Sequence, residues 1–267
     1  MKAKKSLGQN FLRSRSALRT IIDAGDIVAD DIILEIGPGR GALTEELLKF
    51  AGKVIAIEKD RELMESLQSK FSKEIQENKL DLINADILDF NPEILSFYEL
   101  EYKVIANIPY YITGAIIRKF LSSNKQPSKM VLMVQKEVAK RIVANDKKES
   151  ILSLSVKAYG TPRYIATVKK EFFSPKPKVD SAILLIENVS KDFFSGFSEE
   201  KFFTIIKQAF GSKRKTLKNN LSPLFGDKTE LILHKVGIDP KKRAEDLNLS
   251  SWLRLANCTA DQITCSN

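Results

Sequence analysis

The segment Asn107–Tyr110, which reads Asn-Ile-Pro-Tyr, has residue types that could act on the amino group of a nucleobase. The lone pair of an adenine amino nitrogen is delocalised into the ring, which makes this nitrogen a poor nucleophile. The Asn107 side-chain oxygen and the Ile108 carbonyl could accept its two hydrogens, so that the nitrogen becomes pyramidal. Pro109 would stiffen the turn, and the Tyr110 ring could stack on the base, which contributes about 1–3 kcal/mol. An ordinary Asn-Pro turn that closes a strand is the alternative.

A second informative segment is rich in glycine: Gly37, Gly39 and Gly41 lie between an apolar run and a helical pattern. Glycine permits unusual backbone dihedrals and lets a ligand approach the backbone without meeting a Cβ atom. Glu58 ends the next apolar run, where a carboxylate can accept hydrogen bonds from both ribose hydroxyls of an adenosine-containing cofactor. Because the same spacing satisfies the dinucleotide fingerprint, the nicotinamide cofactor of a dehydrogenase is a second possibility.

Polar residues also follow the next two apolar runs. Asp86 comes after one of them and could accept a hydrogen bond from an adenine amino group, and Asn107 ends the other. All of these positions fall at the carboxyl ends of expected parallel strands, where open α/β sheets bind their ligands. The sequence therefore predicts one site that holds both a nucleoside cofactor and a target amine.

The apolar pattern predicts a parallel sheet that would bring these residues together. From about residue 31 to residue 186, short apolar runs alternate with longer amphipathic patterns, which is typical of βαβ units with helices on both faces of a sheet. We expect buried strands at 31–36, 53–58, 80–85, 103–107 and 129–134, and helices at 43–50, 61–71 and 114–121. Two later strands, at 164–170 and 181–188, would form an antiparallel pair at one edge.

The composition changes around residues 189–200, and only helical patterns follow. They cover residues 199–210, 217–221, 229–236 and 250–257. Ser198 precedes two acidic residues and Gly211 follows the first of these patterns, as expected for helix caps. The sequence predicts two domains: an α/β domain over residues 1–190, with a basic N-terminal arm, and a small all-α domain over residues 191–267.

The charge distribution favours a polyanionic partner. The 267 residues include 43 Lys and Arg against 34 Asp and Glu, which gives a formal net charge of +9. The first twenty residues contain six basic residues and no acidic one, and a second basic run contains Lys213, Arg214, Lys215 and Lys218. A solvated tail and a solvated face are the alternatives. Contacts of these runs with the phosphates of such a partner would weaken as salt is added.

Several kinds of site and location are disfavoured. His234 is the only histidine and lies in an apolar helical pattern, so we expect neither a zinc site nor a Ser-His-Asp triad. Cys258 and Cys265 are too few for a disulfide framework. No apolar run approaches the ~18 residues of a membrane span, and a transit peptide does not fit because motif residues begin near Ser6. We expect a soluble protein of the reducing cytoplasm.

Eight segments resemble the small-subunit (16S) ribosomal RNA adenine dimethyltransferase family, in the family's order from residue 5 to residue 257. They are KSLGQNFL at 5–12, the glycine turn at 35–41, NIPY at 107–110, MVQKEVAKR at 133–141, FSPKPKVDSA at 173–182, QAFGSKRKTL at 208–217, RAEDL at 243–247 and LAN at 255–257. Tyr111 stands where many members of the family have Asn, so we assign it no role.

The resemblance implies a Rossmann-like, class I S-adenosylmethionine-dependent methyltransferase domain followed by a helical domain. The substrate would be a pair of adjacent adenosines near the 3′ end of 16S rRNA, in the small ribosomal subunit or its assembly precursor, and we expect a monomeric enzyme. The residues that would contact S-adenosylmethionine are Asn10, Leu12, Gly37, Gly39, Glu58, Asp86 and Asn107. The target base would be handled by Asn107, Pro109, Tyr110 and Phe173, with Tyr110 and Phe173 on either side of an adenine flipped out of its stack.

Two further functions remain open at this point. A sister branch methylates large-subunit rRNA and confers macrolide resistance; it shares the glycine turn and the segment at 107–110, but the segments at 135–138, 177–182 and 213–217 resemble the small-subunit branch. A binding factor in ribosome assembly, with secondary or lost catalysis, is the other possibility, although the motifs show no sign of loss. A dehydrogenase would leave the segment 107–110 and the basic arm unexplained.

Overall fold

The structure, a computed structural model, describes residues 3–4, 7–97, 101–144 and 146–263, which form two compact units. The first unit contains residues up to 139 and residues 160–190, and the second contains residues 140–159 and those from 191 onward. The first unit ends at residue 190, which is also where we expected the first domain to end. The segment 140–159, which we expected in the first domain, is instead part of the second unit, because Leu154 and Ala158 pack in its core.

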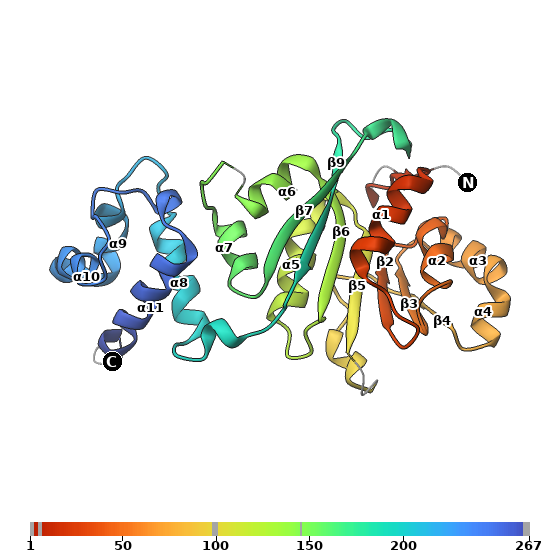
Figure 1. Ribbon diagram of the computed structural model, residues 1–267, viewed down its shortest axis with the longest axis horizontal. Helices are drawn as coiled ribbons and strands as arrows, with labels where there is room; N and C mark the ends of the chain where they lie inside the picture. The colour runs from red at the N-terminus through yellow and green to blue at the C-terminus, as the bar shows by residue number, and fades with distance from the viewer. Residues whose placement is uncertain (1–2, 5–6, 98–100, 145, 264–267) are drawn as a thin grey trace. The chain divides into compact units, whose positions relative to one another are not determined.

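A seven-stranded sheet forms the centre of the first unit (Figure 1). In sheet order, its strands are β4 (Leu80–Asn84), β3 (Lys53–Glu58), β2 (Ile32–Ile36), β5 (Tyr102–Asn107), β6 (Lys129–Gln135), β9 (Ser181–Glu187) and β7 (Thr161–Val168). The first five are parallel, and β9 runs antiparallel to β6 and β7. The expected parallel strands and the antiparallel pair at one edge are confirmed.

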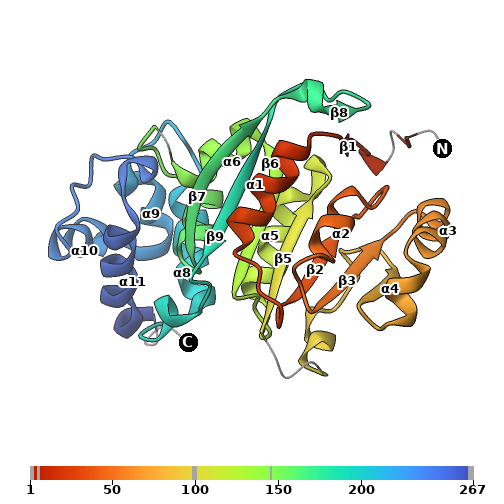
Figure 2. The same ribbon diagram turned by 45° about the vertical axis from the view of Figure 1, so that its right-hand side comes forward.

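The apolar runs become these strands because both faces of the sheet are covered. Helices α1 (Arg15–Gly25) and α2 (Ala42–Leu47) lie on one face, where they share a buried cluster with β-strand residues such as Ile33, Val54 and Ile105. Helix α5 (Thr113–Ser122) lies on the opposite face (Figures 1 and 2). Helices α3 (Arg61–Lys70) and α4 (Ser72–Gln76) follow β3, and α6 (Lys136–Val143) follows β6.

A solvated tail, one of the alternatives for the basic N-terminal segment, is wrong for its residues from 15 onward, because these form helix α1. The Ser14 hydroxyl accepts a hydrogen bond from the Ala17 N–H and caps the helix. Its buried residues Ala17, Leu18, Ile21 and Ile22 lie three and four positions apart and face the sheet. The apolar periodicity in this segment is therefore helical, although its basic residues are the more visible feature of the sequence.

A second, two-stranded sheet joins the N-terminal arm to a distant part of the chain. Strand β1 (Phe11–Leu12) pairs antiparallel with β8 (Phe173–Ser174), with Leu12 opposite Phe173. The Arg13 N–H also donates to the Phe172 carbonyl at 2.8 Å. No pattern in the sequence predicts this pairing, which fixes the arm at its carboxyl end.

The second unit is helical in its described residues. It contains α7 (Ile151–Lys157), α8 (Glu199–Ala209), α9 (Leu217–Phe225), α10 (Thr229–Lys235) and α11 (Leu249–Ile263). Phe202, Leu221, Leu233 and the fully buried Trp252 form the centre of its core. Cys258 is a free thiol, whereas Cys265 lies outside the described residues. Within the described ranges, none of the helices has the length and apolar character that crossing a membrane requires.

Candidate functional site

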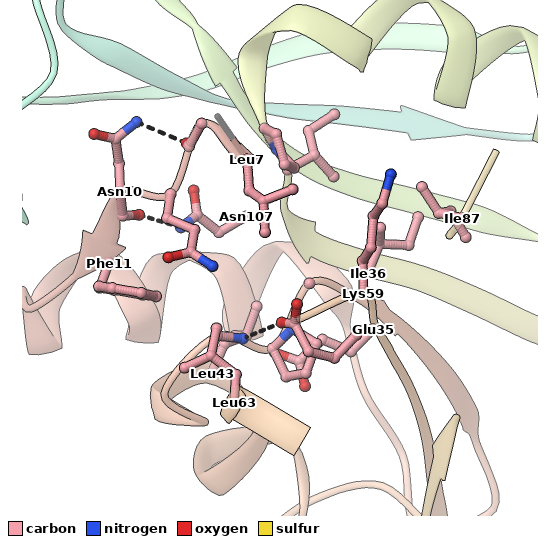
Figure 3. A pocket seen from close by; sticks show the side chains of 18 of the residues that line it. Leu7, Asn10, Phe11, Glu35, Ile36, Leu43, Lys59, Leu63, Ile87 and Asn107 are labelled. Carbon is pink, nitrogen blue, oxygen red and sulfur yellow. Dashed lines mark hydrogen bonds between the residues drawn. The ribbon is translucent and has the colours of Figure 1, made fainter. Parts of the chain in front are cut away.

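A cavity of about 260 Å³ lies at the carboxyl ends of β2, β3, β4 and β5, in the first unit. The arm residues 7–13 close it from another side, and Figure 3 shows Asn10 and Asn107 together across from Lys59 and Ile87. The sequence-predicted residues that line this cavity are Asn10, Leu12, Gly37, Gly39, Glu58, Asp86, Asn107, Pro109 and Tyr110. Phe173 is not among the lining residues.

The glycine turn presents bare backbone to the cavity. Gly37 has a φ of +66°, and a Cβ atom added there would meet nothing within 4 Å. Gly39 has a φ of +60°, and an added Cβ would lie 3.0 Å from the Phe11 ring on the arm. Both residues occupy the left-handed region that favours glycine. Gly37 thus leaves open space beside the backbone, whereas Gly39 leaves room for the arm.

Glu58, at the end of β3, is 6% exposed and forms a hydrogen bond with the glycine turn. Its Oε2 accepts from the Gly39 N–H at 3.1 Å and its Oε1 accepts from the Asp60 N–H at 2.9 Å. Burial raises the pKa of Glu58, and the two backbone hydrogen bonds oppose this shift. Each carboxylate oxygen has a second lone pair, so Glu58 can still accept hydrogen bonds from a ligand.

Asp86, after β4, is held in an ion pair at the cavity wall. Its Oδ2 lies 2.6 Å from Lys59 Nζ, and its Oδ1 accepts from the Leu88 N–H at 3.0 Å. The hydrogen bonds from Lys59 and Leu88 hold the pKa of Asp86 below its ordinary value. Sequence reasoning did not include Lys59, whose partner lies 27 residues away.

Asn107 connects β5 to the arm. Its Nδ2 donates to the Asn10 carbonyl at 3.1 Å, and the Asn10 Nδ2 donates to the Gly8 carbonyl at 3.1 Å (Figure 3). The bond to Asn10 uses an amide N–H of Asn107 and leaves the amide oxygen as the acceptor for an incoming amine. Two residues that the sequence predicted separately therefore form one hydrogen-bonded group.

The two aromatic residues expected to hold the target base differ in their surroundings. Tyr110 lines the cavity, and its hydroxyl lies 2.6 Å from the Ser181 hydroxyl. Burial raises the pKa of Tyr110. Phe173 is 4% exposed and packs in the main core cluster of the first unit. The structure thus brings Tyr110, but not Phe173, into the cavity wall.

Glu35 is a cavity residue that sequence reasoning did not assign to the site. It lies within β2 and is 1% exposed, and its Oε2 is buried without a hydrogen-bond partner among the described residues. Burial raises its pKa to about 8; the nearby Thr44 and Lys70 lower it, and the Glu58 charge raises it further. The signal in the sequence is a single acidic residue inside the apolar run at 32–36.

Asp60 anchors the beginning of the arm, and sequence reasoning did not identify it either. Its carboxylate accepts from Lys4 Nζ at 2.7 Å and from Gln9 Nε2 at 2.8 Å. The same carboxylate caps α3 by accepting from the Glu62 N–H. Lys5 and Ser6, which belong to the same motif, lie outside the described residues. The arm is therefore attached at both ends of its cavity-lining segment.

These residues fit a cofactor that contains adenosine. Open space beside the Gly37 backbone accommodates a ligand chain, and the Glu58 and Asp86 carboxylates can accept hydrogen bonds from a ribose and an adenine amino group. The buried, unpartnered Glu35 oxygen adds a further acceptor in the wall. This donor and acceptor set suits S-adenosylmethionine.

Comparison with known proteins agrees with this geometry. A family model described as "Ribosomal RNA adenine dimethylase" matches residues 1–261. The chain belongs to the ribosomal RNA adenine dimethylase family. The resemblance noted from the sequence motifs and the expected enzyme class, an rRNA methyltransferase, are therefore confirmed.

The chain is similar over nearly its whole length to curated members of the family. It is 45% identical to "Ribosomal RNA small subunit methyltransferase A" of Dehalococcoides mccartyi (strain CBDB1), with 96% of this chain and 88% of the relative covered. It is 40% identical to the protein of the same name from Fusobacterium nucleatum, with 95% of this chain and 96% of the relative covered.

Solved structures of a dimethyladenosine transferase and of an rRNA methyltransferase have the same fold. A dimethyladenosine transferase from Plasmodium falciparum gives a TM-score of 0.78 at 27% identity, covering 92% of this chain and 95% of that one. The 23S rRNA methyltransferase ErmE gives a TM-score of 0.77 at 26% identity, and the match covers 95% of this chain and all of that one. These likenesses confirm the expected fold class, a Rossmann-like methyltransferase with a helical C-terminal part.

Proposed function

We propose that this protein transfers methyl groups from S-adenosylmethionine to the N6 amines of two adjacent adenosines in the 3′-terminal hairpin of 16S rRNA. The product would be N6,N6-dimethyladenosine, formed in the cytoplasm during biogenesis of the small ribosomal subunit. The observation that carries the proposal is the single cavity that combines the glycine turn, Glu58 and the segment Asn107–Tyr110. The names of the curated relatives favour the small subunit as the substrate.

The cofactor would lie along the strand ends, from Gly37 to Asp86. The Glu58 carboxylate would accept hydrogen bonds from the ribose hydroxyls, and Asp86 would accept one from the adenine amino group as Lys59 turns away. Lys59 is exposed, so moving its side chain costs little. Asn10 and Leu12 would cover the bound cofactor from the arm side. Bound S-adenosylmethionine would supply a methyl group on a sulfonium; its thioether leaves without help from an acid or base, and the methylated amine then loses one proton to water.

The target adenosine would enter beside Asn107 after it flips out of its stack. The Asn107 amide oxygen and the Ile108 carbonyl would accept the two amino hydrogens, and Pro109 would keep that carbonyl aimed. Tyr110 would support one face of the base, and Phe173 the other after a local change that exposes its ring. Catalysis would come chiefly from positioning the nitrogen in line with the methyl group.

Transfer of a tritiated methyl group from S-adenosylmethionine tests this function. Undermethylated small subunits and large subunits serve as parallel substrates, and the labelled RNA is digested to nucleosides. We expect the label as dimethyladenosine in the small-subunit RNA alone. Label in the large-subunit RNA alone would assign the protein to the branch that ErmE represents, and no label in either would leave a binding factor as the better explanation.

A further inference from the structure

Ser181 links the expected base-binding residue Tyr110 to the rigid part of the sheet. Its hydroxyl lies 2.6 Å from the Tyr110 hydroxyl, although the two residues are 71 positions apart. Ser181 is fully buried, and Tyr110 lines the cavity. A buried serine hydroxyl so close to the end of the ring restricts the direction in which that ring can point.

The position of Ser181 in the sheet makes it a firm support. It begins β9 and lies opposite Gln135 of β6 on one side and Val168 of β7 on the other, so its backbone is held between two strands. The Tyr110 backbone is held as well, because the Thr113 hydroxyl donates to its carbonyl at 3.0 Å. Tyr110 is therefore fixed at its main chain and at the tip of its side chain.

Asp180, the preceding residue, fixes the segment that leads to Phe173. Its Oδ1 accepts from the Lys170 N–H at 3.1 Å, and its carbonyl accepts from the Lys136 N–H at 3.0 Å. Lys170 begins the short 3-10 helix Lys170–Phe172, which continues directly into Phe173. Two consecutive residues thus hold the two chain segments that carry the expected base-binding rings.

We propose that Ser181 is a positioning residue that holds the Tyr110 ring at the orientation in which the target adenine stacks. This inference rests on the proposed function, because it requires Tyr110 to contact the target base. Removal of the hydroxyl–hydroxyl contact leaves the ring in place but frees its rotation. Transfer should then slow, since small errors in the position of a reacting group reduce the rate of the chemical step strongly.

Three variants test this role: Ser181→Ala, Tyr110→Phe and the double variant. Tyr110→Phe keeps the ring and removes only its hydroxyl. We expect each single variant to lower kcat on undermethylated small subunits by about 10-fold, with little change in KM or in the affinity for S-adenosylhomocysteine. The double variant should be no slower than either single one, because both substitutions remove the same contact.

A matched control removes a similar contact elsewhere in the same sheet. The Tyr164 hydroxyl lies 2.6 Å from the Thr167 hydroxyl on β7, and both residues lie outside the cavity lining. Tyr164→Phe should leave kcat unchanged. Thermal unfolding of every variant shows whether a lower rate reflects lost stability; if Ser181→Ala does not fold, Tyr110→Phe still tests the contact.

The possible outcomes separate this inference from the proposed function. An unchanged kcat for either single variant, or losses that multiply in the double variant, would overturn the positioning role. Tyr110→Ala then shows which proposal has failed: if it is inactive while Ser181→Ala is fully active, the base site stands and the role of Ser181 does not. A wild-type protein that transfers no methyl group would instead overturn the proposed function.

Discussion

The side-chain nitrogen and oxygen of Asn107 have different roles. Its nitrogen holds the Asn10 carbonyl of the arm, and its oxygen is the acceptor for the target amine in the proposed reaction. We expect Asn107→Ala to reduce methyl transfer by about 100-fold or more, because the amine is no longer oriented. Binding of S-adenosylhomocysteine, measured by calorimetry, should weaken far less, by roughly the 5-fold that loss of one arm hydrogen bond costs. Full activity of the variant would show that the target amine lies elsewhere.

Glu35 should make the stability of the protein depend on pH. Burial raises its pKa to about 8 in the folded state, from 4.5 for an ordinary glutamate; the nearby Thr44 and Lys70 lower this pKa, and Glu58 raises it. Between these values the folded state binds a proton that the unfolded state has lost. The free energy of unfolding should therefore fall as the pH rises from about 5 to about 8, by about 1 kcal/mol per pH unit.

Urea unfolding of the wild type and of Glu35→Gln across this range measures the effect. Glutamine is similar in size and does not titrate, so the variant should lose less stability between pH 5 and pH 8. Parallel curves for the two proteins would mean that Glu35 does not titrate in this window. Glu45 is an exposed acid in helix α2, so Glu45→Gln serves as a control for general charge effects.

Residues at strand ends could be predicted from the sequence, whereas residues that support them could not. Glu58, Asp86 and Asn107 follow apolar runs, and the geometry of a parallel sheet gathers such positions at one edge. Asp60 and Ser181 act through partners 51 to 71 positions away. A single sequence contains no signal for such pairs, because the contacts form only when the chain has folded.

At the scale of elements, the arm is held over the cavity by a few polar contacts at its beginning. Asp60 receives hydrogen bonds from Lys4 and Gln9, and the residues that follow line the cavity. We expect Gln9→Ala to weaken binding of S-adenosylhomocysteine by roughly 5-fold, since one such hydrogen bond contributes about 1 kcal/mol. Calorimetry measures the affinity directly.

Lys73→Ala provides the comparison for this arm variant. Lys73 forms an exposed ion pair with Glu77 at 3.8 Å and does not line the cavity. Its removal should leave the affinity unchanged. An unchanged affinity in Gln9→Ala as well would mean that the arm does not cover the bound cofactor.

An element could be predicted from the sequence when it contains a long and regular pattern of apolar residues. The buried strands β2, β3 and β5 are nearly continuous apolar runs, and their limits were predicted to within about one residue. Helix α1 has an equally regular pattern, but its basic residues drew the interpretation towards a solvated segment. Strands β1 and β8 have two residues each and no pattern at all.

At the scale of the whole molecule, the net charge of +9 should make RNA binding sensitive to salt. Lys213, Arg214 and Lys215 are exposed, whereas Lys218 pairs with Glu230. We expect each Ala substitution at 213–215 to reduce the slope of log affinity against log salt by roughly 1. Filter binding to small subunits across a range of potassium chloride measures the slope. Lys218→Ala should change the slope less. Slopes equal to that of the wild type in all variants would exclude phosphate contacts by this run.

The division of the chain into units was predictable only in part. The change of composition near residue 190 marks a real change of unit, but no such change marks residues 140 and 159. The segment between them belongs to the second unit because its apolar residues pack against α8 and its neighbours. Composition describes a segment by itself, whereas membership of a unit depends on what that segment packs against.

The pairing of β1 with β8 has a consequence for the order in which the protein matures. Leu12 is added to the chain 161 positions before its strand partner Phe173. While the chain is being made, the glycine turn and Asn107 can take their places long before β1 has its partner strand. The arm can therefore be fixed at its carboxyl end only after residue 173 has been added, and the growing chain passes through a stage in which the cover of the cofactor site is held at one end alone.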